Sequence, residues 1–135
     1  MIIDSSAVAA LTFEEPGWQE LLSIILNAAS RSMSGASWLE TAVVIDARND
    51  PVLSRRLDEL LEALDVRICD VTPSQAMLAR RAYQDFGKGR QGAGLTFGDC
   101  FTYALAADYR EPLLCKGDDF THTDVDVVEL PRQQS

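Results

Sequence analysis

Short apolar segments alternate with longer segments of helical periodicity, and this alternation restricts the fold more than any other feature of the chain. The segments that suit buried strands are Met1–Ile3, Arg31–Ser34, Val66–Val71, Leu113–Cys115 and Val125–Leu130. Helical patterns fill the intervals between the first four of them. This order predicts an α/β fold in which a central, mainly parallel sheet is flanked by helices on both faces.

The helical segments begin at residues that commonly cap or start helices. The predicted starts are Ser5-Ser6 for a helix over 7–11, Glu14-Glu15-Pro16 for a second, Ser37 for 38–49, Asp50-Pro51 for a fourth, Thr72-Pro73 for a helix to Phe86, and Thr96 or Gly98 for 99–109. Leucines recur at helical spacing from Leu53 to Leu64, which predicts a buried stripe on the fourth helix.

The length and composition suit a single globular domain over 1–135, with 131–135 as a frayed tail. Apolar residues make up 47% of the chain, which excludes a disordered protein. The three cysteines contain no C-x-x-C pair, so buried thiols are expected instead of a zinc knuckle. The first residues do not resemble a signal peptide and no apolar segment could span a membrane, so we expect a cytoplasmic protein with no membrane partner.

The chain is acidic, with 12 Lys and Arg against 21 Asp and Glu and a formal net charge of −9. A protein that coats nucleic acid without sequence preference is normally basic. Any contact with a polyanion is therefore expected to depend on a local basic patch or on bound cations.

Four acidic positions stand out by their place relative to the predicted strands and helices. Asp4 ends the first strand, Glu40 and Asp99 lie in first helical turns, and Asp118-Asp119 follows the strand at 113–115. All are predicted at the carboxyl edge of the sheet, where ligands bind in folds of this kind. Each also has a structural alternative: an aspartate can cap or turn the chain, and Ser37 with Glu40 fits a capping box.

Carboxylates that converge in one cleft repel each other unless a proton or a cation neutralises them. Oxygen ligands of this kind favour Mg²⁺ or Mn²⁺, and such an ion can activate a water against a phosphodiester. The segment 80–90 supports this interpretation, because it holds four basic residues and one acid. Lys88 and Arg90 in this segment, and Lys116 beside the acidic pair, are candidate phosphate contacts; the alternative is a solvated helix face.

Four sequence blocks resemble the PIN-domain ribonuclease toxins of the VapC type over essentially the whole chain. The blocks are Met-Ile-Ile-Asp4-Ser-Ser-Ala, Ser37-Trp-Leu-Glu40-Thr, Gly94-Leu-Thr-Phe-Gly-Asp99-Cys-Phe and Leu114-Cys-Lys-Gly-Asp118-Asp119-Phe-Thr-His-Thr-Asp124. The resemblance implies a PIN-like three-layer sandwich. It also implies an endoribonuclease that uses Mg²⁺ or Mn²⁺ and acts as the toxin of a toxin–antitoxin pair.

The resemblance also implies roles for individual residues. Asp4, Glu40 and Asp99 match the metal-binding acids, and Asp119, in preference to Asp118, matches the fourth acid. Ser6 matches a small hydroxyl position near the first acid. The implied partners are a cognate antitoxin, a structured RNA of the tRNA or rRNA class, and a second copy of the chain in a homodimer.

Two other classes of protein share part of this pattern. A catalytically inactive PIN-like module would keep the fold for protein contacts, and the complete set of acids argues against it. A phospho-receiver also has acids at strand ends, and Lys116 could correspond to its lysine. The first strand of this chain ends in one acid instead of a pair, and Glu40 starts a helix, so the receiver pattern is incomplete.

Overall fold

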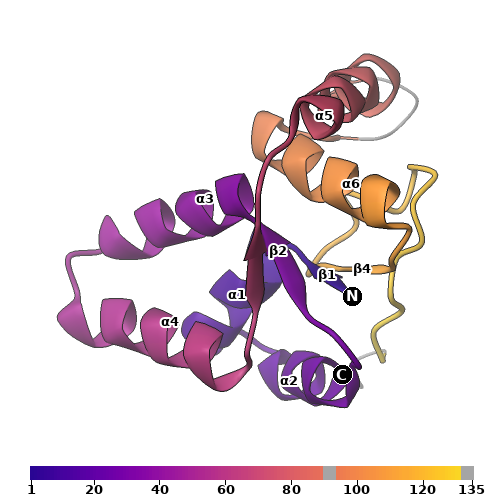
Figure 1. Cartoon of the computed structure of the whole chain (residues 1–135). Helices are drawn as coiled ribbons and strands as arrows, with labels where there is room; N and C mark the ends of the chain where they lie inside the picture. Colours follow the sequence, from indigo (N-terminus) through magenta and orange to yellow (C-terminus); the bar gives the residue numbers. More distant parts are fainter. Residues whose placement is uncertain (90–93, 132–135) are drawn as a thin grey trace.

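A parallel sheet of four strands forms the centre of the computed structural model, which describes residues 1–89 and 94–131 (Figure 1). The strands are β1 (Ile2–Ile3), β2 (Ser32–Ser34), β3 (Arg67–Cys69) and β4 (Leu113–Leu114). Their order is β3-β2-β1-β4, and every neighbouring pair is parallel. The predicted α/β class with a parallel sheet is confirmed.

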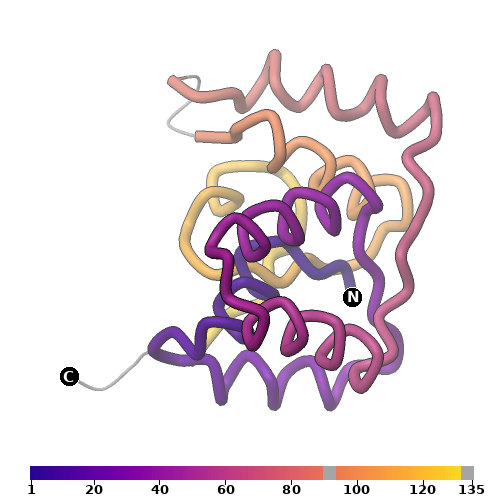
Figure 2. Tube along the Cα trace, turned by 90° about the vertical axis from the view of Figure 1, so that its left-hand side faces the viewer, coloured from indigo at the N-terminus to yellow at the C-terminus, as the bar shows by residue number. Residues whose placement is uncertain are grey.

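Six helices connect or cover these strands in the described residues. They are α1 (Ser5–Thr12), α2 (Trp18–Asn27), α3 (Gly35–Asp46), α4 (Pro51–Ala63), α5 (Pro73–Phe86) and α6 (Phe97–Tyr109). Helix α5 runs along the outer side of α6, at the opposite end of the molecule from α2 (Figures 1 and 2). No helix among the described residues combines the length and the apolar character needed to cross a membrane.

The two faces of the sheet carry separate cores, because successive side chains of a strand point in opposite directions. Ile3 and Met33 lie in a core that α1, α2, α3 and α4 complete. Ile2 and Leu113 lie in the other core, against α5 and α6. Helices therefore cover both faces, as expected for a three-layer sandwich.

Three of the predicted helix starts are confirmed by side-chain caps. Asp50 accepts a hydrogen bond from the N–H of Val52 at the start of α4, Thr72 caps α5, and Thr96 caps α6. Each cap satisfies a backbone N–H that would otherwise have no partner in the first turn.

Other predicted starts were wrong. Asp4, not Ser5 or Ser6, caps α1, because its Oδ2 accepts the Ser6 N–H at 3.0 Å. Helix α2 begins only at Trp18, since Gly17 precedes it with a φ of 91° that suits glycine. Helix α3 begins at Gly35, so the predicted cap Ser37 lies within the helix.

The predicted strand over Val125–Leu130 is also wrong. Only an isolated parallel bridge joins Leu113 to Val127, with two backbone hydrogen bonds, from Leu113 N–H to the Asp126 carbonyl and from Val128 N–H to the Leu113 carbonyl. The segment passes beside β4 at the edge of the sheet, where one short neighbour cannot extend the pairing. Of the predicted frayed tail, residues 132–135 lie outside the described part of the chain.

Arg31, predicted as part of the second strand, instead joins the ends of two helices. Its guanidinium donates to the carbonyls of Ile25 at 2.6 Å and Leu26 at 3.0 Å in α2, and to that of Leu64 after α4 at 2.8 Å. These carbonyls lie at the carboxyl ends of two helices, where backbone acceptors lack part of their helical partners and a cation is also favoured.

We expect Arg31→Met to lower the free energy of unfolding by about 2 kcal/mol, because hydrogen bonds from a charged donor are lost at both helix ends. Urea denaturation measures the change. Arg55→Met, an exposed arginine on α4, is the matched control and should shift the midpoint little. Equal effects of the two substitutions would contradict the role assigned to Arg31.

Candidate active site

Asp4 is the most firmly held acid of the candidate site. It directly follows β1 and is only 3% exposed. Its Oδ2 accepts the N–H of Ser6 as the cap of α1, and its Oδ1 accepts the hydroxyl of Thr102 at 2.6 Å. Both carboxylate oxygens are therefore fixed, one by the backbone and one by α6.

Thr102 is a site residue that the sequence analysis missed. Its hydroxyl is buried and lies 3.0 Å from the hydroxyl of Ser37 on α3, so a hydrogen-bonded chain runs from α3 through α6 to Asp4. The missed signal was spacing: Thr102 lies three residues after Asp99, which places both on one face of a helix. The capping box of Ser37 and Glu40, the structural alternative for Glu40, does not form, because α3 begins at Gly35 with Ser34 as its N-cap.

Asp99 lies in the first turn of α6 and completes a capping box with Thr96. Its Oδ2 accepts the Thr96 N–H at 3.0 Å, and the Thr96 hydroxyl accepts the Asp99 N–H at 3.3 Å. The pKa of the Asp99 carboxyl is raised from 3.8 to about 6, chiefly by burial and also by the charges of Asp4 and Asp119, while the hydrogen bonds of Thr96 act in the opposite direction. The three carboxyl groups are therefore close enough to interact.

Glu40 reaches the same region from α3. Its Oε1 accepts the hydroxyl of Ser5 at 2.9 Å. Its carboxylate also lies against Gly98, where an added Cβ would come within 1.9 Å of Oε2. Glycine at this position lets the Glu40 carboxylate approach the backbone next to Asp99.

Asp118 and Asp119 follow β4 a few residues after Cys115. The pKa of the Cys115 thiol depends on the charges of the four candidate aspartates. Burial is the largest cause that raises the pKa of Cys115 to about 12, and the charges of Asp4, Asp119, Asp99 and Asp118 contribute to this rise in that order. Asp119 also raises the pKa of Asp99, whereas Asp118 is not among the groups that shift it. This difference favours Asp119 as the fourth acid of the cluster.

The donor set suits a hard divalent cation, because it consists of carboxylates whose mutual repulsion a cation would offset. Among residues 1–89 and 94–131, no three acidic, Cys or His side chains are arranged to hold an ion together. Mg²⁺ commonly keeps several waters in proteins, so few protein ligands are enough to hold it.

The predicted phosphate contacts occupy different surroundings. Ser6 Oγ accepts the backbone N–H of Lys116 at 3.0 Å, and the Lys116 ammonium lies 3.0 Å from Glu15. Lys88 is exposed and lines a groove beside α6 whose lining does not include Lys116. Arg90 lies outside the described residues. The structure thus brings Ser6 and Lys116 together and places Lys88 at a different groove.

The sequence of the chain is similar to those of known proteins. A family profile described as PIN domain matches residues 1–126. Ribonuclease VapC28 of Mycobacterium tuberculosis is 51% identical over 126 residues, which cover 93% of this chain and 95% of that protein.

Two solved structures share the fold. VapC20 of Mycobacterium tuberculosis, described as a sarcin-ricin loop cleaving toxin, matches with a TM-score of 0.75 and 15% identity, over 94% of this chain and 97% of its own. A toxin–antitoxin complex from Klebsiella pneumoniae contains a chain that matches with a TM-score of 0.70 and 17% identity, over 94% and 95%.

We expect Asp99→Asn to stabilise the metal-free protein above pH 6. A folded-state pKa of about 6, above the usual 3.8, means that the folded chain holds a proton that the unfolded chain releases between these values. The contribution of Asp99 to stability therefore falls as the pH rises through this window. The neutral amide should raise the free energy of unfolding by about 1–2 kcal/mol at pH 8, after allowance for solvent screening.

Urea denaturation in a chelating buffer at pH 4 and at pH 8 measures this difference. The gain should shrink at pH 4, where the native carboxyl is already protonated. Asp58→Asn, an exposed acid on α4, is the control and should show no comparable gain. A loss of stability at pH 8 in Asp99→Asn would contradict the assigned repulsion.

Proposed function

The chain belongs to the PIN domain family as a VapC-type endoribonuclease, and from that membership we propose that it cleaves RNA at the carboxylate cluster of Asp4, Asp99 and Glu40. We assign Asp119 as the fourth acid. The observation that carries the proposal is geometric: Thr102, on the helix that holds Asp99, binds Asp4, and the Glu40 carboxylate lies against Gly98 on that same helix. We propose Mg²⁺ as the cofactor, with Mn²⁺ as a substitute.

A divalent cation bound here would offset the charge of the carboxylates, polarise the scissile phosphate and lower the pKa of a water. Asp4 and Asp99 would hold it. Asp4 suits this role because Thr102 and the backbone of Ser6 fix both its oxygens before any ligand arrives. A preorganised ligand loses little freedom on binding.

Glu40 is assigned to the attacking water. The Ser5 hydroxyl holds its Oε1, and its Oε2 lies against Gly98, beside Asp99. A carboxylate oxygen in that position can accept a hydrogen bond from a water and orient it for in-line attack on phosphorus. Glu40 is exposed, so its charged form stays solvated until RNA covers it.

Basic side chains would bind the RNA backbone on either side of the carboxylates. Lys88 is assigned to one side, and Ser6 with Lys116 to the other; Arg90, outside the described residues, stays a phosphate contact predicted from the sequence alone. Lys116 would exchange its ion pair with Glu15 for a phosphate, at modest cost because exposed ion pairs contribute little to stability. These contacts would position the substrate without reading its sequence.

Two solved structures of the same fold support a proposal about the substrate and the protein partner of this chain. VapC20 is described as cleaving the sarcin-ricin loop, and the Klebsiella structure is described as a toxin–antitoxin complex. We propose that this chain is likewise the toxin of such a pair, that its substrate is a structured RNA of the rRNA or tRNA class, and that it acts as a homodimer.

Incubating total RNA with the purified chain, free of any partner, tests the proposal. We expect discrete fragments with Mg²⁺ or Mn²⁺ and none with a chelator. Asp99→Asn should reduce cleavage by at least about 100-fold, because an amide removes the charge that binds the cation. Intact RNA in every lane with folded protein would favour an inactive module with the same fold.

A paired substitution within the same assay tests the fourth acid. Asp119→Asn should impair cleavage, whereas the adjacent Asp118→Asn is the matched control and should retain most of it. Circular dichroism confirms that both variants fold. The opposite order would assign the role to Asp118.

We expect Gly98→Ala to reduce cleavage at least about tenfold while the fold is retained. The added methyl would displace the Glu40 carboxylate, which can swing into solvent because it is the end of a flexible side chain. Gly94→Ala is the control, since an added Cβ meets nothing within 4 Å there. Full activity of Gly98→Ala would contradict the position assigned to Glu40.

A further inference from the structure

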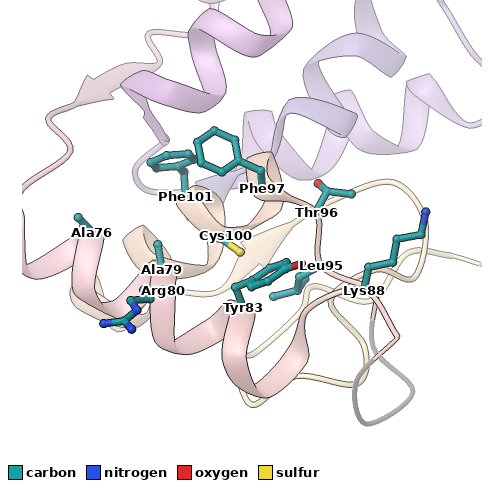
Figure 3. Close-up of a pocket in the computed structure, with 10 residues that line it drawn as sticks. All are labelled: Ala76, Ala79, Arg80, Tyr83, Lys88, Leu95, Thr96, Phe97, Cys100 and Phe101. Carbon is teal, nitrogen blue, oxygen red and sulfur yellow. The ribbon is translucent and has the colours of Figure 1, made fainter.

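A groove of about 710 Å³ lies between α5 and α6, on the side of α6 that faces away from the sheet (Figure 3). Ala76, Ala79 and Tyr83 line it from α5, and Phe97, Cys100 and Phe101 line it from α6. Its volume is that of a small-molecule site, and most of its lining is apolar or aromatic. The proposed cleavage mechanism does not use this groove.

Aromatic rings in the groove are exposed to solvent. The Phe97 side chain is 79% exposed and Tyr83 is 47% exposed. Phe97 is not loose, because its ring packs edge-on against Phe101 with the ring centroids 5.1 Å apart and an interplanar angle of 86°. Most of the Phe97 side chain is thus open to solvent while its ring is held by Phe101, and exposed aromatic rings of this kind stack unpaired bases in proteins that bind single strands.

Two basic side chains also lie in the groove, although the protein as a whole is acidic. Arg80 and Lys88 line it, and Figure 3 shows their charged ends on either side of the aromatic rings. Within residues 1–89 and 94–131, neither forms an ion pair with an acid. Two cations beside an exposed aromatic face match a ligand that alternates bases with phosphates.

The groove and the carboxylate cluster share the first turn of α6. Thr96 lines the groove, and its N–H binds the Asp99 carboxylate. Gly98, the residue after Phe97, lies against Glu40. A base stacked on Phe97 would therefore be close to the phosphate cleaved at the acids.

We propose, building on the proposed function, that this groove binds one unpaired base of the RNA substrate, stacked on Phe97, with Arg80 and Lys88 on the adjoining phosphates. Phe97 then selects RNA in which a base next to the cut can leave its stack. Stacking on an aromatic face tolerates every base, so this contact distinguishes unpaired from paired nucleotides more than it distinguishes sequences.

A protein segment or a second copy of the chain could also cover an apolar groove. The two cationic side chains, Arg80 and Lys88, favour RNA as the ligand, because a purely apolar partner would leave both without a counter-charge. The position of the groove next to Asp99 favours RNA as well. Oligomeric state is therefore measured alongside RNA binding.

The test uses the full chain carrying Asp99→Asn, so that RNA is bound and not cut. The probe is a short single-stranded oligouridylate with one 2-aminopurine, whose fluorescence is quenched when the base stacks. We expect quenching on binding, a loss of affinity of about tenfold or more with Phe97→Ala, and recovery with Phe97→Trp. Met77→Ala, 73% exposed on α5 but outside the groove lining, is the matched control and should leave binding unchanged.

In the chain with Asp99 intact, Phe97→Ala should raise KM for RNA cleavage at least about fivefold and change kcat less. Unchanged quenching and unchanged KM would overturn the groove inference and leave the nuclease proposal standing. Absence of cleavage by the parent chain would count against the nuclease, while the quenching assay would still decide the groove. Dissociation of a dimer by Phe97→Ala, seen by light scattering, together with unchanged probe binding by the monomer, would overturn the inference in favour of a protein interface.

Discussion

Repulsion among carboxylates at one edge of a parallel sheet is the constraint on which the rest of this structure depends. Asp4 and Asp99 are buried and close enough for the charge of one to raise the pKa of the other. Hydrogen bonds from Thr102 and Thr96 hold them in place despite this cost. The protein thus keeps an unfavourable arrangement that a cation would relieve, which is common at functional sites.

Helix α6 connects this site to the rest of the molecule. Its first turn carries Asp99 and Gly98, and its inner face supplies Thr102, which joins Asp4 to Ser37. Its outer side forms the aromatic groove with α5. A single rigid helix therefore fixes the acids relative to the groove, and sites built on helices are held more accurately than sites built on loops.

The fold class could be predicted from the sequence because strands and helices have different hydrophobic periods, and the caps Asp50, Thr72 and Thr96 marked true helix starts. The errors have physical causes. Val125–Leu130 reads as a strand, but it has only the short β4 to pair with. Pro16 suggested a helix start, but the positive φ of Gly17 delays α2 to Trp18.

The sequence by itself determined the parallel α/β order of elements, the placement of acids after strands and in first helical turns, and the family. These properties depend on local chemistry and on contiguous motifs. Only the tertiary structure decided that Thr102 supports Asp4, that Gly98 makes room for Glu40, and that Phe97 of α6 lines a groove with α5. Each of these depends on helices distant in sequence packing within a few ångströms, and no local pattern specifies such distances.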